Sequence, residues 1–130
     1  MEITIKQEQA RVPVTVFQLV GDMTSEEPMK TKVKEAQAAG TRNLLIDLTH
    51  VRYMSSSGLR ALHGAFMLLR GSEAGESKEA MSSGIASGTF TSPHVKLLKP
   101  SEHVLQVLKT AGFDMFLEIF TDYKTALASF

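Results

Sequence analysis

The hydrophobic and polar positions of this chain change their spacing several times, and each change predicts a new secondary-structure element. Alternating positions predict a strand from Glu2 to Gln9, and a run rich in β-branched residues predicts a second strand from Val12 to Val20. The near-continuous apolar run from Leu44 to Leu48 is typical of a strand that is covered on both faces. Two later apolar runs predict further strands, from Val95 to Leu98 and from Met115 to Phe120.

Helical spacing between the strands predicts two helices in the first half of the chain. The first should run from about Ser25 to Ala39, because Thr24 to Glu27 fits a capping box and Gly40 follows its end. The second should start at the serines that follow the third strand. Its apolar positions recur at helical spacing, at Leu59, Leu62, Phe66 and Leu69.

Two more helices complete the pattern. One should begin at Ser101 and stop at Gly112, and the last should be capped by Thr121. Strands that alternate with helices predict an α/β fold for residues 1–130 as a single domain. The sheet should be mixed and mostly parallel, with an antiparallel N-terminal strand and about four helices. Its core should contain Ile46, Leu48, Leu62, Phe66 and Leu108.

The segment from Gly71 to Ser92 interrupts this alternation. It is rich in glycine, serine and other small residues and has no clear period. So long a loop inside a compact domain is unusual. This one has little apolar area to offset the entropy that ordering would cost. We therefore expect a flexible insertion at residues 71–92.

Charge and composition exclude several classes of protein. The 14 lysines and arginines balance 14 aspartates and glutamates, so the chain lacks the basic excess expected for binding nucleic acid or an anionic membrane. Cysteine is absent, which excludes disulfides and thiolate sites. The first residues lack the apolar run of a signal peptide, and no run is long enough to cross a bilayer. We expect a cytoplasmic protein.

Three consecutive serines and a glycine, Ser55 to Gly58, separate the third strand from the second helix. The first N–H groups of a helix have no partners within it, and the positive end of the helix dipole lies there, so this turn suits a negative group. A serine at this place is either a plain N-cap or the acceptor of a phosphate. One cap needs only one serine, and spacing alone leaves the choice open.

Three blocks of the chain resemble the STAS domain family of bacterial anti-sigma factor antagonists. Leu44 to Leu48, with Val51 to Met54, is similar to the family's apolar strand and the approach to its signature loop. Ser55 to Leu59 stands where the family usually has Asp-Ser-Ser-Gly and an apolar residue. Leu105 to Phe113, followed by Phe116 to Phe120, is similar to the family's C-terminal helix and strand. The resemblance covers nearly the whole chain outside the expected insertion, and it implies the same α/β fold.

The resemblance also implies a function. In the family, a partner that is both a serine kinase and an anti-sigma factor phosphorylates the first serine of the motif, which Ser56 matches. Ser57 and Gly58 match the second serine and the glycine, and Ser55 replaces the usual aspartate. The unphosphorylated protein would bind the kinase and release a sigma factor, and a phosphate on Ser56 would end that binding. Ser55 and Ser57 are secondary candidates for the phosphate.

The missing aspartate keeps an alternative open, a non-catalytic scaffold or sensor module in a larger regulatory complex. In either role the expected partner surface joins the loop after the second strand to the start of the second helix. An antagonist would be a monomer or a weak homodimer, whereas a scaffold would form a large homo-assembly. The surface residues are Asp22, Thr24, Ser25, His50, Ser55, Ser56, Ser57, Gly58, Arg60 and Met67.

Other kinds of site find little support in the sequence. A serine hydrolase would need a base and an orienting acid, and the Gly-X-Ser-X-Gly elbow is missing. The four histidines are scattered, and no two stand at helical ligand spacing with a carboxylate. A nucleotide phosphate would fit the turn at Ser55 to Gly58, but a glycine-rich loop and a nearby lysine are absent. We expect no catalytic residue, metal or cofactor.

Overall fold

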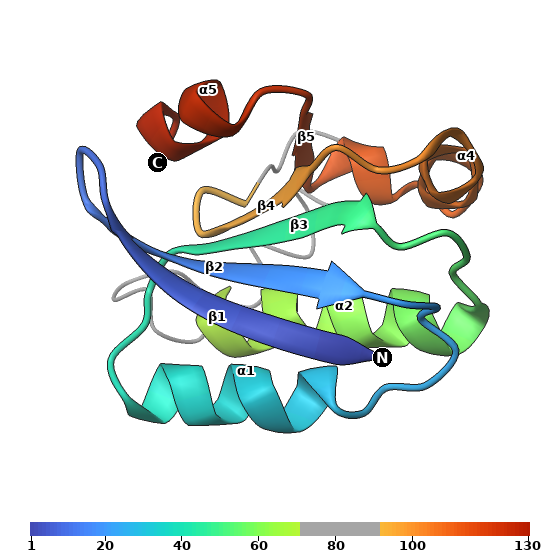
Figure 1. Ribbon diagram of the computed structural model, residues 1–130, viewed down its shortest axis with the longest axis horizontal. Helices are drawn as coiled ribbons and strands as arrows, with labels where there is room; N and C mark the ends of the chain where they lie inside the picture. Colours follow the sequence, from blue (N-terminus) through green and yellow to red (C-terminus); the bar gives the residue numbers. More distant parts are fainter. Residues whose placement is uncertain (71–91) are drawn as a thin grey trace, which may run out of the picture.

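Within residues 1–70 and 92–130, the part of the chain that this computed structural model describes, five strands form one sheet in the order β1-β2-β3-β4-β5 (Figure 1). β1 pairs antiparallel with β2, and the other neighbours are parallel. This confirms the predicted α/β fold with a mixed, mostly parallel sheet. The strands are β1 (Glu2–Gln9), β2 (Pro13–Val20), β3 (Leu44–His50), β4 (Val95–Leu98) and β5 (Glu118–Phe120).

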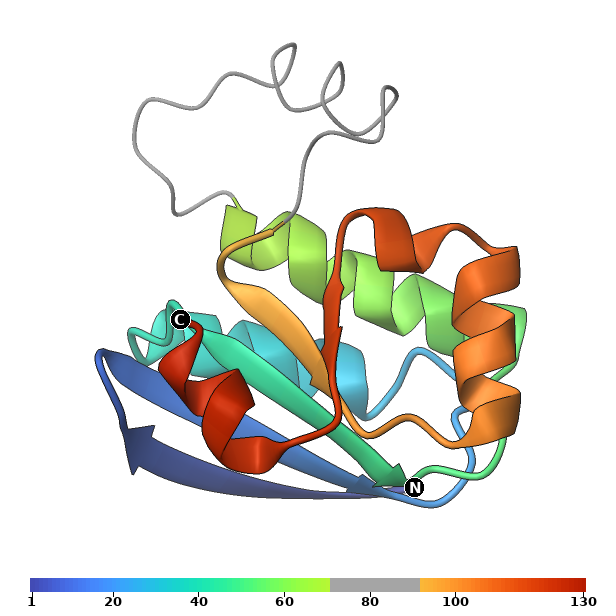
Figure 2. The ribbon, with the colours of Figure 1, turned by 90° about the horizontal axis from the view of Figure 1, so that it is seen from above.

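Helices cover both faces of the sheet. α1 and α2 lie side by side on one face, and α5 lies on the other (Figures 1 and 2). Alternation along β2 explains these layers, because Phe17 and Leu19 pack on the α1–α2 side while Val14 and Val16 pack on the α5 side. The helical elements are α1 (Met29–Ala38), α2 (Ser56–Arg70), α4 (Glu102–Thr110), α5 (Tyr123–Ala128) and the short 3-10 turn η1 (Phe113–Met115).

The five predicted core residues are all completely buried, which confirms the inner face assigned to α2. Phe66 also packs against Phe116 edge to face, with 5.0 Å between the ring centroids. The five predicted core residues are Ile46, Leu48, Leu62, Phe66 and Leu108.

α1 begins at Met29, so the predicted start at Ser25 is wrong. A helix capped by Thr24 would need the N–H of residue 28 for its first internal hydrogen bond, and Pro28 has none. Proline also disfavours helical dihedral angles at the residue before it, Glu27. The Ser25 hydroxyl instead accepts a hydrogen bond from the Glu27 N–H at 3.3 Å, so this segment is a turn and the capping box does not form.

Three other predicted helix boundaries are confirmed. Gly40 and Gly112 follow the ends of α1 and α4 with φ angles of +102° and +79°, which favour glycine. Ser101 caps α4, since its hydroxyl accepts a hydrogen bond from the Val104 N–H at 3.3 Å.

The strand predicted from Met115 to Phe120 is shorter, because its first part turns away from the sheet. The Leu117 N–H donates to the carbonyl oxygen of Phe113 at 3.0 Å, which closes a helical turn around η1. This turn carries Phe116 into the core beside α2. The burial of the Phe116 ring therefore outweighs the strand propensity of this segment.

Asp122 caps α5, so the predicted cap at Thr121 is wrong by one residue. The Asp122 carboxylate accepts hydrogen bonds from the backbone N–H of Thr125 at 2.8 Å and from the Thr125 hydroxyl at 2.7 Å. These two hydrogen bonds lower the pKa of Asp122. An ionised oxygen at the helix start also meets the positive end of the dipole.

The insertion expected at 71–92 lies outside the described residues except for Ser92. Ser92 is buried, and its hydroxyl accepts hydrogen bonds from the N–H groups of His94 and Val95, both at 3.2 Å. Ser92 therefore packs at the start of the segment that leads into β4.

Candidate partner-binding and phosphorylation site

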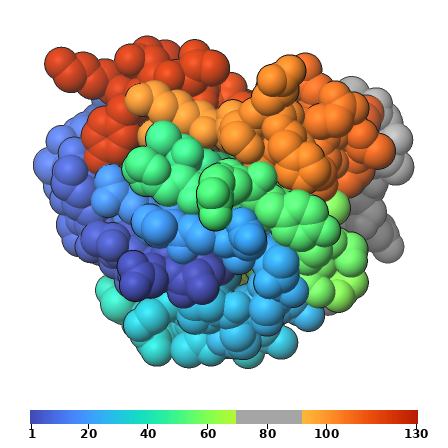
Figure 3. All heavy atoms as spheres, turned by 45° about the vertical axis from the view of Figure 1, so that its right-hand side comes forward, coloured from blue at the N-terminus to red at the C-terminus, as the bar shows by residue number. Residues whose placement is uncertain are grey.

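The loops that follow β2 and β3 meet at one edge of the sheet, because the carboxyl ends of parallel strands lie together. Met23 and Met54, both buried, form an isolated parallel bridge between the loops. The Met23 N–H donates to the carbonyl oxygen of Tyr53 at 2.9 Å, and the Met23 carbonyl accepts from the Ser55 N–H at 2.9 Å. Figure 3 shows the two loops side by side on one surface, with α4 next to the second.

Ser55 is the N-cap of α2. Its hydroxyl oxygen accepts hydrogen bonds from the N–H groups of Ser57 at 3.2 Å and Gly58 at 3.4 Å. The same hydroxyl donates to the carbonyl oxygen of Met23 at 3.2 Å. Ser55, which stands where the resemblance leads one to expect an aspartate, therefore keeps the cap without an aspartate's charge.

Ser56 is the first residue of α2 and is exposed. Its side chain has no hydrogen-bond partner in the part of the chain that the structure describes. Since Ser55 already caps the helix, the Ser56 hydroxyl is free to react or to contact another molecule. The N-terminal end of α2 would stabilise a negative charge placed there.

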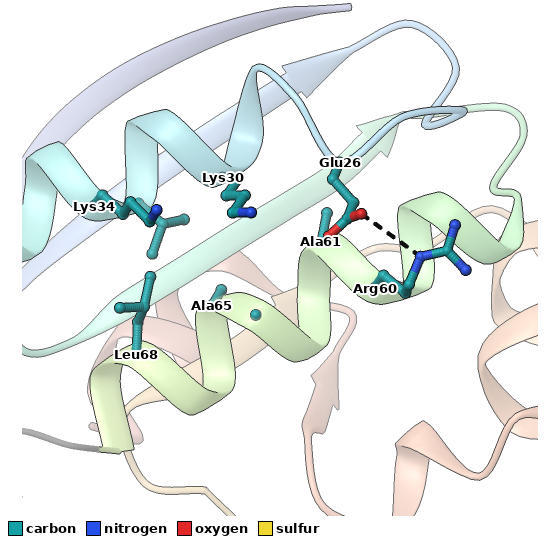
Figure 4. Close-up of a pocket in the computed structure, with 9 residues that line it drawn as sticks. Glu26, Lys30, Lys34, Arg60, Ala61, Ala65 and Leu68 are labelled. Carbon is teal, nitrogen blue, oxygen red and sulfur yellow. Dashed lines mark ion pairs between the residues drawn. The ribbon is translucent and has the colours of Figure 1, made fainter.

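Arg60 links the start of α2 to the turn before α1. Its guanidinium Nη2 donates to the Ser57 hydroxyl at 2.8 Å, and its Nε lies 3.6 Å from a carboxylate oxygen of Glu26. Figure 4 shows this ion pair at one end of the cavity between α1 and α2. Arg60 belongs to the surface predicted from the sequence, whereas Glu26 does not, because no local pattern joins residues from different elements.

The predicted surface residues differ in their accessibility and position. Ser55 and Ser57 are half-buried, and Gly58 is buried against Met23. Met67 lies three turns along α2, about 16 Å from Ser56 along the helix axis. It therefore falls outside the group of residues gathered at the sheet edge. The exposed members are Asp22, Thr24, Ser25, His50, Ser56, Arg60 and Met67.

An aromatic pair that no sequence pattern predicted borders this edge. The rings of Tyr53 and His103 are stacked, with 5.5 Å between centroids and 13° between planes. Tyr53 is 45% exposed although it is large and partly apolar. Beside the pair, Leu59 and residues of α4 line a shallow cavity of about 290 Å³. Fifty positions separate the two rings in the sequence, so only folding brings them together.

The remaining histidines lie apart from Ser56. His63 is exposed on α2 near Phe66 and Phe116, and the Nδ1 atom of His94 lies 2.9 Å from the amide oxygen of Asn43. In the described ranges, three or more histidine, aspartate or glutamate side chains nowhere gather as a metal site would require. The described helices also include none with the length and apolar character needed to cross a bilayer.

Solved structures share this fold. A candidate anti-sigma factor antagonist from Thermotoga maritima is 16% identical, covers 95% of this chain and 90% of its own, and has a TM-score of 0.66. The anti-sigma factor antagonist SpoIIAA in its unphosphorylated form is 19% identical, with 95% and 93% covered and a TM-score of 0.64. The Bacillus cell fate determinant SpoIIAA in its phosphorylated form is 17% identical, with 95% and 96% covered and a TM-score of 0.58.

No curated protein matches the chain in sequence. The model of the STAS domain matches residues 5–74, more than half of the chain. The match spans β2, β3 and the serine motif at the start of α2. This chain therefore belongs to the STAS domain family.

Proposed function

We propose that this chain is a cytoplasmic anti-sigma factor antagonist that binds an anti-sigma serine kinase and loses that binding when Ser56 is phosphorylated. One observation carries the proposal: the Ser56 hydroxyl is exposed at the first residue of a helix that Ser55 already caps. Family membership supports it, as does the likeness to SpoIIAA, whose structures include an unphosphorylated and a phosphorylated form.

The chemistry belongs to the kinase, and this domain supplies only the acceptor. The Ser56 oxygen forms a bond to the γ-phosphorus of ATP while the bond from that phosphorus to the β–γ bridging oxygen breaks. ADP leaves, and the hydroxyl proton passes to a base of the kinase. Exposure of Ser56 is what this transfer requires of the substrate.

The phosphate would switch binding off through its charge. It adds about −1.5 to −2 charges at neutral pH at a position where the protein has a neutral hydroxyl. The N-terminal end of α2 accommodates that charge within the domain, whereas an acidic or apolar partner surface would reject it. The switch needs no refolding.

The partner would rest on the exposed residues around Ser56. The loop after β2 contributes Asp22, Thr24 and Ser25, and the end of β3 contributes His50. Backbone hydrogen bonds between the two loops hold these groups in one rigid surface. Such preorganisation reduces the entropy lost on binding.

The second candidate, a regulatory scaffold, is favoured by Ser55. A kinase that recognises an acidic residue beside its target finds a neutral hydroxyl here. We therefore expect phosphorylation of the wild type to be slower than phosphorylation of a Ser55→Asp variant. Both side chains can cap the helix, so the comparison isolates the charge.

The decisive experiment incubates the purified protein with a cognate anti-sigma kinase and ATP and maps the phosphate by mass spectrometry. Phosphate on Ser56, absent in Ser56→Ala but present in Ser57→Ala, supports the antagonist. An unmodified protein that elutes as a stable large assembly in size-exclusion chromatography favours the scaffold instead.

A further inference from the structure

Arg60, four residues after Ser56 on α2, holds two partners from different parts of the fold. It donates to the Ser57 hydroxyl at 2.8 Å within α2, and it pairs with Glu26 at 3.6 Å across to the turn that precedes α1. Figure 4 shows the guanidinium and the carboxylate facing each other between these segments. The pair thus ties the start of α2 to the turn.

Ser56 and Arg60 are neighbours on the surface of α2, because residues four apart share one face of a helix. Both are exposed. The guanidinium already reaches back to the first turn, as its hydrogen bond to Ser57 shows. A phosphate on Ser56 would therefore lie beside it.

We propose that Arg60 receives the phosphate of Ser56 and releases Glu26, so that phosphorylation is transmitted from α2 to the turn before α1. This inference rests on the proposed function, since it concerns the phosphorylated form. A phosphate carries more charge than a carboxylate and has three oxygens that match the guanidinium fork. Glu26 competes only weakly with the phosphate for Arg60. The Arg60 and Glu26 side chains are 60% and 44% exposed, so solvent screens their attraction.

The release of Glu26 would change a second surface. Glu26 and Arg60 both line the cavity of about 150 Å³ between α1 and α2, which is otherwise bordered by apolar side chains and by Lys30 and Lys34. Without the ion pair, one end of this cavity loses the contact that joins α2 to the turn before α1 (Figure 4). Phosphorylation would then alter the partner surface both at Ser56 and at this rim.

The test uses full-length protein with phosphoserine incorporated at position 56 during translation, so that no kinase is needed. A pH titration followed by ³¹P NMR measures the second pKa of the phosphate. Arg60→Gln should raise that pKa by about half a pH unit or more, because the nearby cation is lost. Arg42→Gln is the matched control, since Arg42 is exposed at the opposite end of the parallel strands and the charge change is the same. Equal effects of the two substitutions would overturn the proposal.

A second comparison tests the competition with Glu26. Glu26→Gln should lower the phosphate pKa by more than Glu27→Gln does, and the difference should vanish in an Arg60→Gln background. A difference that persists without Arg60 would mean that Glu26 acts directly and not through the arginine. Circular dichroism confirms that each variant folds. A negative kinase assay would overturn the proposed function alone, whereas these titrations bear only on Arg60.

Discussion

A Cβ atom placed on Gly58 would lie 2.6 Å from the carbonyl oxygen of Met23. That oxygen cannot move freely, because it accepts hydrogen bonds from both the N–H and the hydroxyl of Ser55. The side chains of Met23 and Met54 would approach the same Cβ to 2.9 and 2.8 Å. The glycine of the serine motif is therefore needed for the close contact between the two loops.

Gly58→Ala should destabilise the protein by about 1–3 kcal/mol, since the methyl group forces the loop after β2 away from α2. Urea denaturation followed by circular dichroism measures the loss. The same change should weaken kinase binding, because the loop after β2 carries part of the proposed surface. Wild-type stability in this variant would show that the loops separate at no cost.

Gly64→Ala is the matched comparison within the same helix. A Cβ there meets nothing within 4 Å, so alanine adds helix propensity without a clash. We expect a gain of about 0.5–1 kcal/mol in the free energy of unfolding. A loss at this position would mean that α2 tolerates no added methyl group, and the result for Gly58 would then not be specific.

Phe66→Ala should cost about 3–5 kcal/mol, because the ring is completely buried and packs against Phe116. Met67→Ala, one position along the helix, should change stability by about 0.5 kcal/mol or less, since Met67 is 41% exposed. Thermal and urea unfolding of the pair compare the two faces of α2. Similar losses in both variants would contradict the assigned inner face.

Ser56→Asp should fold normally and melt at a slightly higher temperature, because a negative charge stabilises a helix at its N-terminus. It should nevertheless lose binding to the anti-sigma kinase in isothermal titration calorimetry. Ser56→Asn, which has nearly the same size without the charge, is the control and should bind more tightly than the aspartate variant. If both bind equally, charge is not what switches the interface.

The cap of α5 should make stability depend on pH on the acidic side. Hydrogen bonds from the hydroxyl and the backbone N–H of Thr125 lower the pKa of Asp122 in the folded state. The ionised cap therefore stabilises the fold above the unfolded pKa of about 3.9, and this contribution is lost as the pH falls through the folded pKa. Asp122→Asn should reduce the drop in melting temperature between about pH 6 and pH 2. An unchanged drop would show that other carboxylates dominate.

Local patterns in the sequence are enough to predict the order of the elements and the serine cap at the start of α2. Apolar periodicity predicted the strands and the buried face of α2, and the serines predicted a capped helix start. These features depend on neighbours within a few positions along the chain, so they can be predicted from local patterns. Where the local signals conflicted, as at Pro28 after a capping-box sequence, backbone chemistry overrode the motif and α1 began later.

Contacts between distant residues depend instead on how the elements pack together. The packing of α1 beside α2 brings Glu26 to Arg60, and the position of α4 at the sheet edge stacks His103 on Tyr53. The short β5 likewise follows from where Phe116 is buried, because the turn around η1 removes the first part of the predicted strand from the sheet. Such contacts join residues that are far apart in the chain. They form because burial of the common core fixes the relative positions of the elements, and the local sequence of one element does not indicate which other element it will contact.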